Sequence, residues 1–349
     1  MHHLDIRTRA YELLQYRLQG LALRSGLNVS RPTFICIKLT MRCNARCRHC
    51  DIYKPEHAIP ELTTEQWIGV LRRLRSWLGA GAPITVTGGE ILLRRDLFEV
   101  LGAARDLELS LYLLTNGWLV NEARATALLE LDPRVVQVSL DGVSDGTHDF
   151  LRGLEGFGKR ARHAIELLSA AKRACDASTD LVLNVVIFKQ NLDEVADVAR
   201  WAREHGIDSI KYQPIEQTYM EPHDPRWFER SPLWIDDTAA AHRVIDQLIH
   251  LKGEGYPIHN TVDSLEFMKH YFADPLALQK KVVSHDQHLR SRSCRSAVAD
   301  FDIDANGDVR LCYRMDPIGN VAERDPRDIW NNRPRCWTRP CRFLEDPLS

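Results

Sequence analysis

The chain has 349 residues, with 46 lysines and arginines against 48 aspartates and glutamates, so the formal net charge at pH 7 is −2. Hydrophobic residues make up 44% and charged residues 27%, which is typical of a globular protein and argues against disorder. The near-zero charge argues against a nucleic-acid or anionic-membrane partner. The unusual component is a set of nine cysteines.

The first 32 residues are predicted to form a helical extension, with apolar side chains at roughly helical spacing between Tyr11 and Leu21. They contain neither the apolar core nor the cleavage site of a signal peptide. No stretch approaches the roughly 18 apolar residues that a membrane span requires. We therefore expect a cytoplasmic protein, in which clustered cysteines bind metal more often than they form disulfides.

Between residues 33 and 215, apolar runs alternate with amphipathic helical stretches. Six such alternations predict a parallel sheet with crossover helices. We expect a partial (β/α)6 barrel that resembles a TIM barrel, with the active site at the carboxyl ends of the strands; a doubly wound sheet is the alternative. The strands are predicted to begin at Thr33, Ile84, Leu111, Val135, Leu181 and Ser209.

The pattern changes after Ile215. Helices are predicted around Thr238–Lys252 and Asp263–Phe272, and Asn306-Gly307 is a strong turn signal for a β-hairpin. The expected division is a helical extension at 1–32, a barrel at 33–220, a connecting helical segment at 221–284, and a small cysteine-rich hairpin and helix domain at 285–349.

Cys43, Cys47 and Cys50 form a C-x3-C-x2-C run directly after the first predicted strand. A [4Fe–4S] cluster needs four ligands, and thiolate is its usual protein ligand, so three cysteines would leave one iron open. The alternative is a zinc site completed by His49. Zinc loops favour two-residue spacing between cysteines, and His49 stands directly between two of the ligands.

At these residues the sequence resembles the radical S-adenosylmethionine (radical SAM) superfamily, over roughly residues 33–215. The cysteine spacing is the family's own, and further family-like motifs follow in order at strand ends. Two positions depart from the family pattern: Ile91 replaces the usual proline, and His49 replaces an aromatic residue. The motifs are Gly88-Gly89-Glu90, Thr115-Asn116-Gly117, Ser139-Leu140-Asp141-Gly142 and the stretch from His148 to Gly153.

The resemblance implies that Cys43, Cys47 and Cys50 hold a [4Fe–4S] cluster that binds S-adenosylmethionine. Reductive cleavage, with electrons from a donor such as flavodoxin or ferredoxin, would release a 5′-deoxyadenosyl radical that abstracts a hydrogen atom from the substrate. Glu90 would accept the methionine ammonium group, and Arg152 would meet its carboxylate. The remaining implied cofactor-binding residues are Gly88, Gly89, Thr115, Asn116, Ser139 and Asp141.

Each of these motifs also has an ordinary structural interpretation. Gly88 and Gly89 are compatible with a simple strand-to-helix turn, Asp141 with another turn, and Arg152 with a solvated surface charge. The order of the motifs behind the three-cysteine loop favours the functional interpretation.

Four further cysteines, Cys294, Cys312, Cys336 and Cys341, supply the ligands for either one iron–sulfur cluster or one structural zinc ion. The spacing from Cys294 through Gly307 to Cys312 is similar to the opening of the SPASM extension, and four cysteines resemble its shortened twitch form. This resemblance implies an auxiliary [4Fe–4S] cluster. Ligation by all four cysteines would suit electron relay or structural support.

The leading functional hypothesis is two-electron oxidation of a small hydroxylated metabolite, such as a sugar or aminocyclitol, in natural product biosynthesis. The first alternative is redox-neutral epimerisation or dehydration. Epimerisation needs a hydrogen donor, for which Cys36 is the candidate, because it shares one face of the first strand with Lys38 and Thr40. A small buried apolar side chain is the ordinary interpretation of Cys36.

Two other hypotheses remain. One is modification of a ribosomal peptide, which is weakened because only residues 1–32 precede the first strand where such enzymes often carry a leader-binding domain. The other is a zinc-stabilised binding module without catalysis. A general base is not resolved, and each candidate also fits an ordinary polar side chain. The candidates are Lys38, Gln137, Lys211, Gln213 and Glu216 on the strands and His223 in the connecting segment.

Overall fold

The computed structural model describes residues 3–25, 27–218, 220–222, 224–276, 296–312 and 315–334. Within these ranges the strands form one sheet in the order β6-β5-β4-β3-β2-β1-β7-β8-β9. Strands β1 to β6 each pair in parallel with the next. They are β1 (Phe34–Lys38), β2 (Pro83–Thr87), β3 (Ser110–Thr115), β4 (Val135–Ser139), β5 (Asp180–Ile187) and β6 (Ser209–Pro214).

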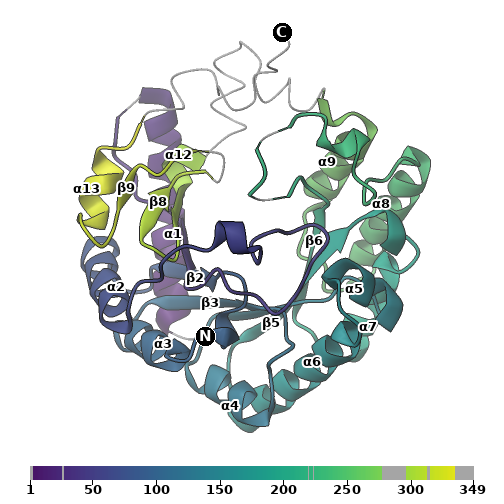
Figure 1. The fold of residues 1–349 in the computed structure, drawn as a ribbon, viewed down its shortest axis with the longest axis horizontal. Coiled ribbons are helices and arrows are strands. Elements are labelled where there is room, and N and C mark those ends of the chain that lie inside the picture. Colours follow the sequence, from purple (N-terminus) through teal and green to yellow (C-terminus); the bar gives the residue numbers. More distant parts are fainter. Residues whose placement is uncertain are drawn as a thin grey trace.

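Helices connect these strands and lie along the outer side of the curved sheet (Figure 1). This arrangement confirms the predicted partial barrel, since parallel neighbours require a crossover connection. The crossover helices are α2 (Thr64–Leu78), α3 (Leu97–Asp106), α4 (Glu122–Glu130), α5 (Asp145–Arg152), α6 (Phe157–Ala174) and α7 (Val195–Glu204). The short 3-10 helices are η1 (Pro55–His57), η2 (Ile91–Leu93), η3 (Lys189–Asn191) and η4 (Trp227–Glu229).

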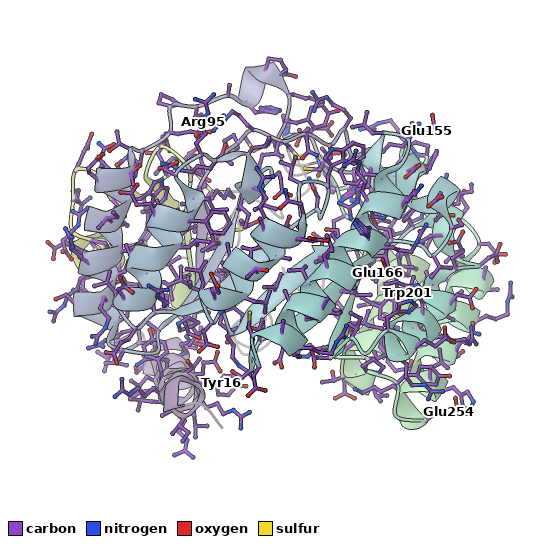
Figure 2. All side chains as sticks on the ribbon, turned by 90° about the horizontal axis from the view of Figure 1, so that it is seen from below. Tyr16, Arg95, Glu155, Glu166, Trp201 and Glu254 are labelled. Carbon is purple, nitrogen blue, oxygen red and sulfur yellow. The ribbon has the colours of Figure 1, made fainter. Side chains whose placement is uncertain are left out.

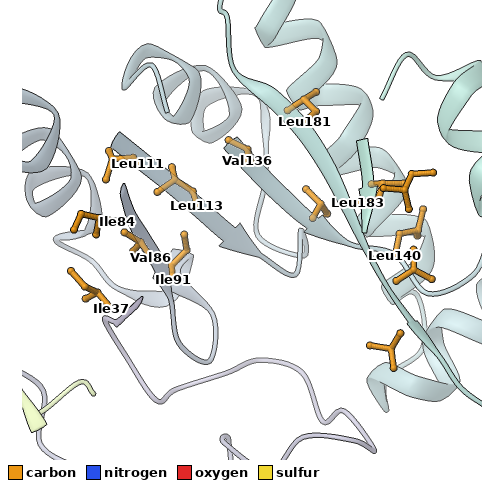
Figure 3. Close-up of a cluster of buried hydrophobic side chains, with 14 of the residues drawn as sticks. Ile37, Ile84, Val86, Ile91, Leu111, Leu113, Val136, Leu140, Leu181 and Leu183 are labelled. Carbon is orange, nitrogen blue, oxygen red and sulfur yellow. The ribbon is translucent and has the colours of Figure 1, made fainter. Parts of the chain in front are cut away.

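The two faces of the sheet carry different side chains, because successive residues of a strand point to opposite sides. The outer face packs against the helices as the main hydrophobic core (Figure 3). Ile37 and Val86 belong to this core, whereas their neighbours Lys38 and Thr87 line a cavity on the inner side. The polar inner face therefore provides the site, and the apolar outer face provides the stability.

The predicted hairpin is confirmed as β7 (Asp300–Ile303) and β8 (Asp308–Arg310), which are antiparallel and are followed by β9 (Gly319–Asn320). Strand β7 also pairs in parallel with β1, from Phe34 opposite Asp300 to Ile37 opposite Ile303. The hairpin thus extends the barrel sheet, which the expected division at residue 285 did not anticipate. The domain boundaries themselves stay predictions.

The remaining elements flank the barrel. They are α1 (His3–Ser25), α8 (Thr238–Gly253), α9 (Val262–Ala273), α12 (Ser296–Ala299) and α13 (Pro326–Asn331). In Figure 2 the loops with Arg95 and Glu155, which follow β2 and β4, lie along one edge, and Glu254 lies at the opposite edge. Among the described helices, none is long and apolar enough to cross a membrane.

Candidate active site

The cysteine loop after β1 is held on one side by the loop that follows β2. The backbone N–H of Gly89 donates to the carbonyl oxygen of Thr40 at 2.8 Å, and that of Glu90 donates to the carbonyl oxygen of Arg42 at 2.9 Å. A Cβ atom on Gly89 would lie 2.2 Å from the Arg42 oxygen. Glycine is therefore needed here for contact with the cysteine loop itself.

Helix α5 holds the other side of the same loop. The N–H groups of Arg46 and Arg48 donate to the carbonyl oxygens of Arg152 and Leu151, at 3.0 and 2.8 Å. Gly153 ends the helix with φ +73°, and a Cβ atom there would lie 2.2 Å from the Arg46 carbonyl oxygen. Two motifs that are far apart in the sequence thus clamp the cysteine loop between them.

Two of the three sulfur atoms of this loop, those of Cys43 and Cys47, accept hydrogen bonds from N–H groups. Cys43 Sγ accepts from the backbone N of Ala45 at 3.4 Å, and Cys47 Sγ accepts from Nη1 of Arg152 at 3.8 Å. Donors of this kind stabilise thiolates.

The three thiols suit a cluster better than a single metal ion. Burial raises the pKa of Cys43 to about 11 and that of Cys50 to about 12, so deprotonation requires a bound cation. Within the described residues, no three His, Cys, Asp or Glu side chains are placed to hold one metal ion. A zinc ion needs its ligands around one point, whereas an iron–sulfur cluster offers several irons to its thiolates. The donor set fits a [4Fe–4S] cluster.

Glu90 lies behind the cysteine loop, with 1% of its surface exposed. Its carboxylate accepts hydrogen bonds from the N–H of Leu92 at 3.0 Å, the hydroxyl of Thr115 at 2.8 Å and the N–H of Asn116 at 2.7 Å. Burial raises the pKa of Glu90, and these bonds oppose the rise. The Asn116 amide in turn lies 3.9 Å from Cys43 Sγ. Direct contact between Glu90 and the methionine ammonium group stays a prediction.

Asp141 and Arg152 form an ion pair at the end of β4. Oδ2 of Asp141 accepts from Nε and Nη2 of Arg152 at 2.9 and 2.6 Å, and Oδ1 accepts from the backbone N of Val186 at 3.0 Å. Burial favours a raised pKa for Asp141, but the Arg152 guanidinium together with His148 and His49 outweighs it, and this pKa is held well below its usual range. Asp141 is fully buried, so its predicted cofactor contact stays a prediction.

Sequence reasoning assigned no role to two residues that hold Asp141 in place. His148 Nδ1 accepts from the backbone N of Asp141 at 3.0 Å, and Asn191 Nδ2 donates to the Asp141 carbonyl oxygen at 2.8 Å. Both side chains are fully buried. His148 belongs to a motif quoted from the sequence, whereas Asn191 lies in the short helix η3 and carries no recognisable sequence signal.

A cavity of about 570 Å³ lies beside this loop, on the inner side of the barrel strands. Of the predicted site residues, Cys50, Gly88, Ser139 and Arg152 line it, and so do the general-base candidates Lys38, Gln213 and Glu216. The lining does not include Cys36, Gln137 or Lys211. Further lining residues are His49, Ile52, Thr87, Asn184, Val186, Tyr212, Pro214, Ile215, Gln217 and Met268.

The hairpin adds a carboxylate that sequence reasoning missed: Asp304, which directly follows β7, contacts Lys38 in the cavity lining. Lys38 Nζ donates to Asp304 Oδ1 at 2.7 Å, and Arg310 Nε donates to Asp304 Oδ2 at 2.9 Å. Cys36 pairs in register with Asp302, and burial raises the pKa of the Cys36 thiol to about 12. The alternation of Asp with Phe and Ile from residue 300 to 304 was the sequence signal for a strand with its aspartates on one face. The role of Cys36 as hydrogen donor stays a prediction.

Of the four C-terminal cysteines, the structure describes only Cys312, which is partly buried after β8. Cys294, Cys336 and Cys341, like the general-base candidate His223, lie outside the described residues. Their predicted roles are therefore not tested by the geometry.

Comparison with protein families decides the assignment. The model of the radical SAM superfamily matches residues 37–202, and the SPASM model of an iron–sulfur cluster-binding domain matches residues 294–347. The chain belongs to the radical SAM superfamily. The first match contains the clamped cysteine loop, and the second contains all four C-terminal cysteines. The cofactors of this radical SAM protein are [4Fe–4S] clusters and S-adenosylmethionine.

Individual proteins resemble this radical SAM chain over different lengths. It is 27% identical over 320 residues to the AdoMet-dependent heme synthase of Methanosarcina barkeri, covering 86% of this chain and 82% of that protein. It is 32% identical over 201 residues to the PqqA peptide cyclase of Rhizobium meliloti, covering 57% and 50%. The structure of Streptococcus suis SuiB bound to S-adenosylmethionine shares the fold, with TM-score 0.67 and 17% identity, covering 93% of this chain and 71% of that chain.

Proposed function

We propose that this radical SAM enzyme oxidises a small hydroxylated metabolite, of the sugar or aminocyclitol class, by two electrons. The observation that carries the proposal is the cavity of about 570 Å³ next to Cys50, which both polar and apolar side chains line. This volume lies within the range of small-molecule sites, and the substrate would share it with S-adenosylmethionine, because Gly88, Ser139 and Arg152 also line it. When bound, S-adenosylmethionine and its cluster supply a 5′-deoxyadenosyl radical that removes one hydrogen atom from the substrate.

The chain's own residues would bind and orient the substrate. Asn184 and Gln213 present amides from neighbouring strands, and Lys38 and Glu216 add an ammonium and a carboxylate to the same lining. Amide and charged groups of this kind match the donors and acceptors of a hydroxylated ring. Their positions on the barrel strands, or directly after β6 in the case of Glu216, favour fixed orientation of the reacting carbon.

The second electron has a proposed destination. After hydrogen abstraction, the carbinol carbon holds one unpaired electron; transfer of that electron to the auxiliary cluster and loss of the hydroxyl proton to solvent give a carbonyl. The auxiliary cluster would be held by Cys294, Cys312, Cys336 and Cys341. Each turnover would then remove two hydrogens from the substrate.

Anaerobic turnover tests this proposal. We expect the purified chain, loaded with iron and sulfide, to form 5′-deoxyadenosine from S-adenosylmethionine and dithionite, and a sugar or aminocyclitol substrate to yield a product two hydrogens lighter. Cys47→Ala should abolish 5′-deoxyadenosine formation. Cys312→Ala should retain it but lose the oxidised product. Stoichiometric zinc without iron would contradict the whole assignment.

A tetrapyrrole is a second candidate substrate, because the heme synthase relative aligns over most of both chains. Porphyrins with carboxylate side chains, supplied in the same assay, would identify this class through product formation and a shifted Soret band.

Epimerisation would instead give a product of unchanged mass with one solvent hydrogen. A peptide product would support modification of a ribosomal peptide. The similarity to the PqqA peptide cyclase, which covers half of that protein, favours this alternative.

A further inference from the structure

Arg152 contacts an acidic side chain and a cysteine of the cluster loop at the same time. Its side chain is 6% exposed and borders the cavity. Nε and Nη2 donate to Oδ2 of Asp141, while Nη1 donates to Sγ of Cys47 at 3.8 Å. The planar guanidinium carries its N–H groups in a rigid fork, so the carboxylate on one edge fixes the direction of the other.

Hydrogen bonds around Asp141 fix the orientation of the Arg152 guanidinium. Asp141 is held by the backbone N of Val186, by Asn191 and by His148, so it cannot rotate freely to carry Arg152 away from the sulfur. Nδ1 of His148 accepts the Asp141 N–H, and burial lowers the His148 pKa, which favours the neutral imidazole against the opposing effect of Asp141. The negative charge of Asp141 is therefore directed at Arg152.

Cys47 differs from Cys43 in the charge of its donor. Cys43 accepts from the backbone N of Ala45 and from the amide of Asn116, which are both neutral. Among these described contacts, the guanidinium of Arg152 is the one charged donor to a sulfur. A charge-assisted hydrogen bond is stronger than a neutral one.

We propose that Arg152 is a positioning residue that raises the reduction potential of the cluster on this loop through its hydrogen bond to Cys47. Adding one electron makes the cluster more negative, and a cationic donor to a ligating sulfur stabilises that form. The inference rests on membership of the radical SAM superfamily and does not depend on the substrate proposed above.

Potentiometric titration followed by electron paramagnetic resonance tests the proposal on the full, iron-loaded chain. Arg152→Met removes the charge and the donor. The titration is run without S-adenosylmethionine, and a parallel sample with it identifies the signal of the cluster with the open iron. At the wild-type midpoint, we expect at least a tenfold lower ratio of reduced to oxidised cluster, equal to a potential about 59 mV more negative for one electron.

Arg48→Met is the matched control. Arg48 lies on the same loop and contacts the same helix, donating from Nε to the carbonyl oxygen of Phe150 at 2.8 Å, but it does not touch a sulfur in the structure. We expect its ratio of reduced to oxidised cluster, at the wild-type midpoint, to stay within twofold of wild type. Equal effects of the two variants would show loosening of the loop and would overturn the proposal.

Arg152→Lys keeps the test decisive if Arg152→Met fails to hold iron. A single ammonium cannot reproduce the fork that joins Asp141 to Cys47. We expect Arg152→Lys to retain its iron. At the wild-type midpoint, its ratio of reduced to oxidised cluster should be at least threefold lower than that of wild type. A wild-type ratio in every variant that holds iron would overturn the role of Arg152.

Discussion

Nζ of Lys38 lies 2.7 Å from Oδ1 of Asp304, although 266 residues separate the two in the sequence. Both side chains are nearly buried, with 8% and 12% of their surfaces exposed. The ion pair ties the first barrel strand to the C-terminal hairpin and fixes an ammonium group in the wall of the cavity. The hairpin that precedes Cys312 is thereby connected, through Lys38, to the wall of the cavity.

Removal of the anionic partner should destabilise the protein. In Asp304→Asn, the buried ammonium of Lys38 loses its counter-ion, and we expect a loss of about 3–5 kcal/mol, as for other broken buried pairs. Urea unfolding monitored by circular dichroism measures this change. Asp316→Asn, on an exposed loop, should change the free energy of unfolding by less than about 0.5 kcal/mol. Similar values for both variants would contradict an energetic role for the pair.

Asp302 should make stability depend on pH. Burial and the neighbouring Asp300 and Asp304 raise its pKa from 3.8 to about 6, against the effect of Lys38. Between these pH values the folded state binds more protons than the unfolded state, so this contribution to stability falls as pH rises from about 4 to about 6. Asp302→Asn should therefore raise the free energy of unfolding by roughly 2–3 kcal/mol over wild type at pH 7 and by little at pH 4. A gain of equal size at both pH values would contradict titration of Asp302.

Gly153 and Gly156 offer a matched pair of substitutions. Both have positive φ, +73° and +80°, but a Cβ on Gly153 meets the Arg46 carbonyl oxygen at 2.2 Å, whereas one on Gly156 meets nothing within 4 Å. Gly156→Ala should cost about 1–2 kcal/mol from backbone strain and retain full iron content. Gly153→Ala should cost more and lose iron from the cysteine loop. Iron analysis and thermal unfolding measure both, and equal iron content would show that the contact is unimportant.

Glu90→Gln should loosen the clamp without a large change in volume. The new amide has one acceptor oxygen where the carboxylate has two, so one of the donors from Leu92, Thr115 and Asn116 loses its partner. We expect a loss of about 1–3 kcal/mol in unfolding free energy. Glu99→Gln, an exposed change on α3, is the control for urea unfolding. An unchanged midpoint for Glu90→Gln would show that its hydrogen bonds contribute little.

Patterns within short stretches of sequence predicted the barrel and its cofactor. A local apolar run predicts each strand, and Asn306-Gly307 predicts the hairpin, because backbone conformation depends mainly on neighbouring residues. The spacing of Cys43, Cys47 and Cys50 is equally local, since one loop must present all three thiolates. The candidate ligands could therefore be named before the fold was known.

By itself the sequence thus determined the six parallel strands of the barrel core, the three-cysteine loop and the family. Only the tertiary structure decided that Glu90 and Asp141 face inward to protein donors, that Arg152 reaches Cys47, and that Asp304 meets Lys38. These contacts join residues that lie 11 to 266 positions apart. Their geometry depends on how strands and helices pack against one another, and no local periodicity encodes that packing.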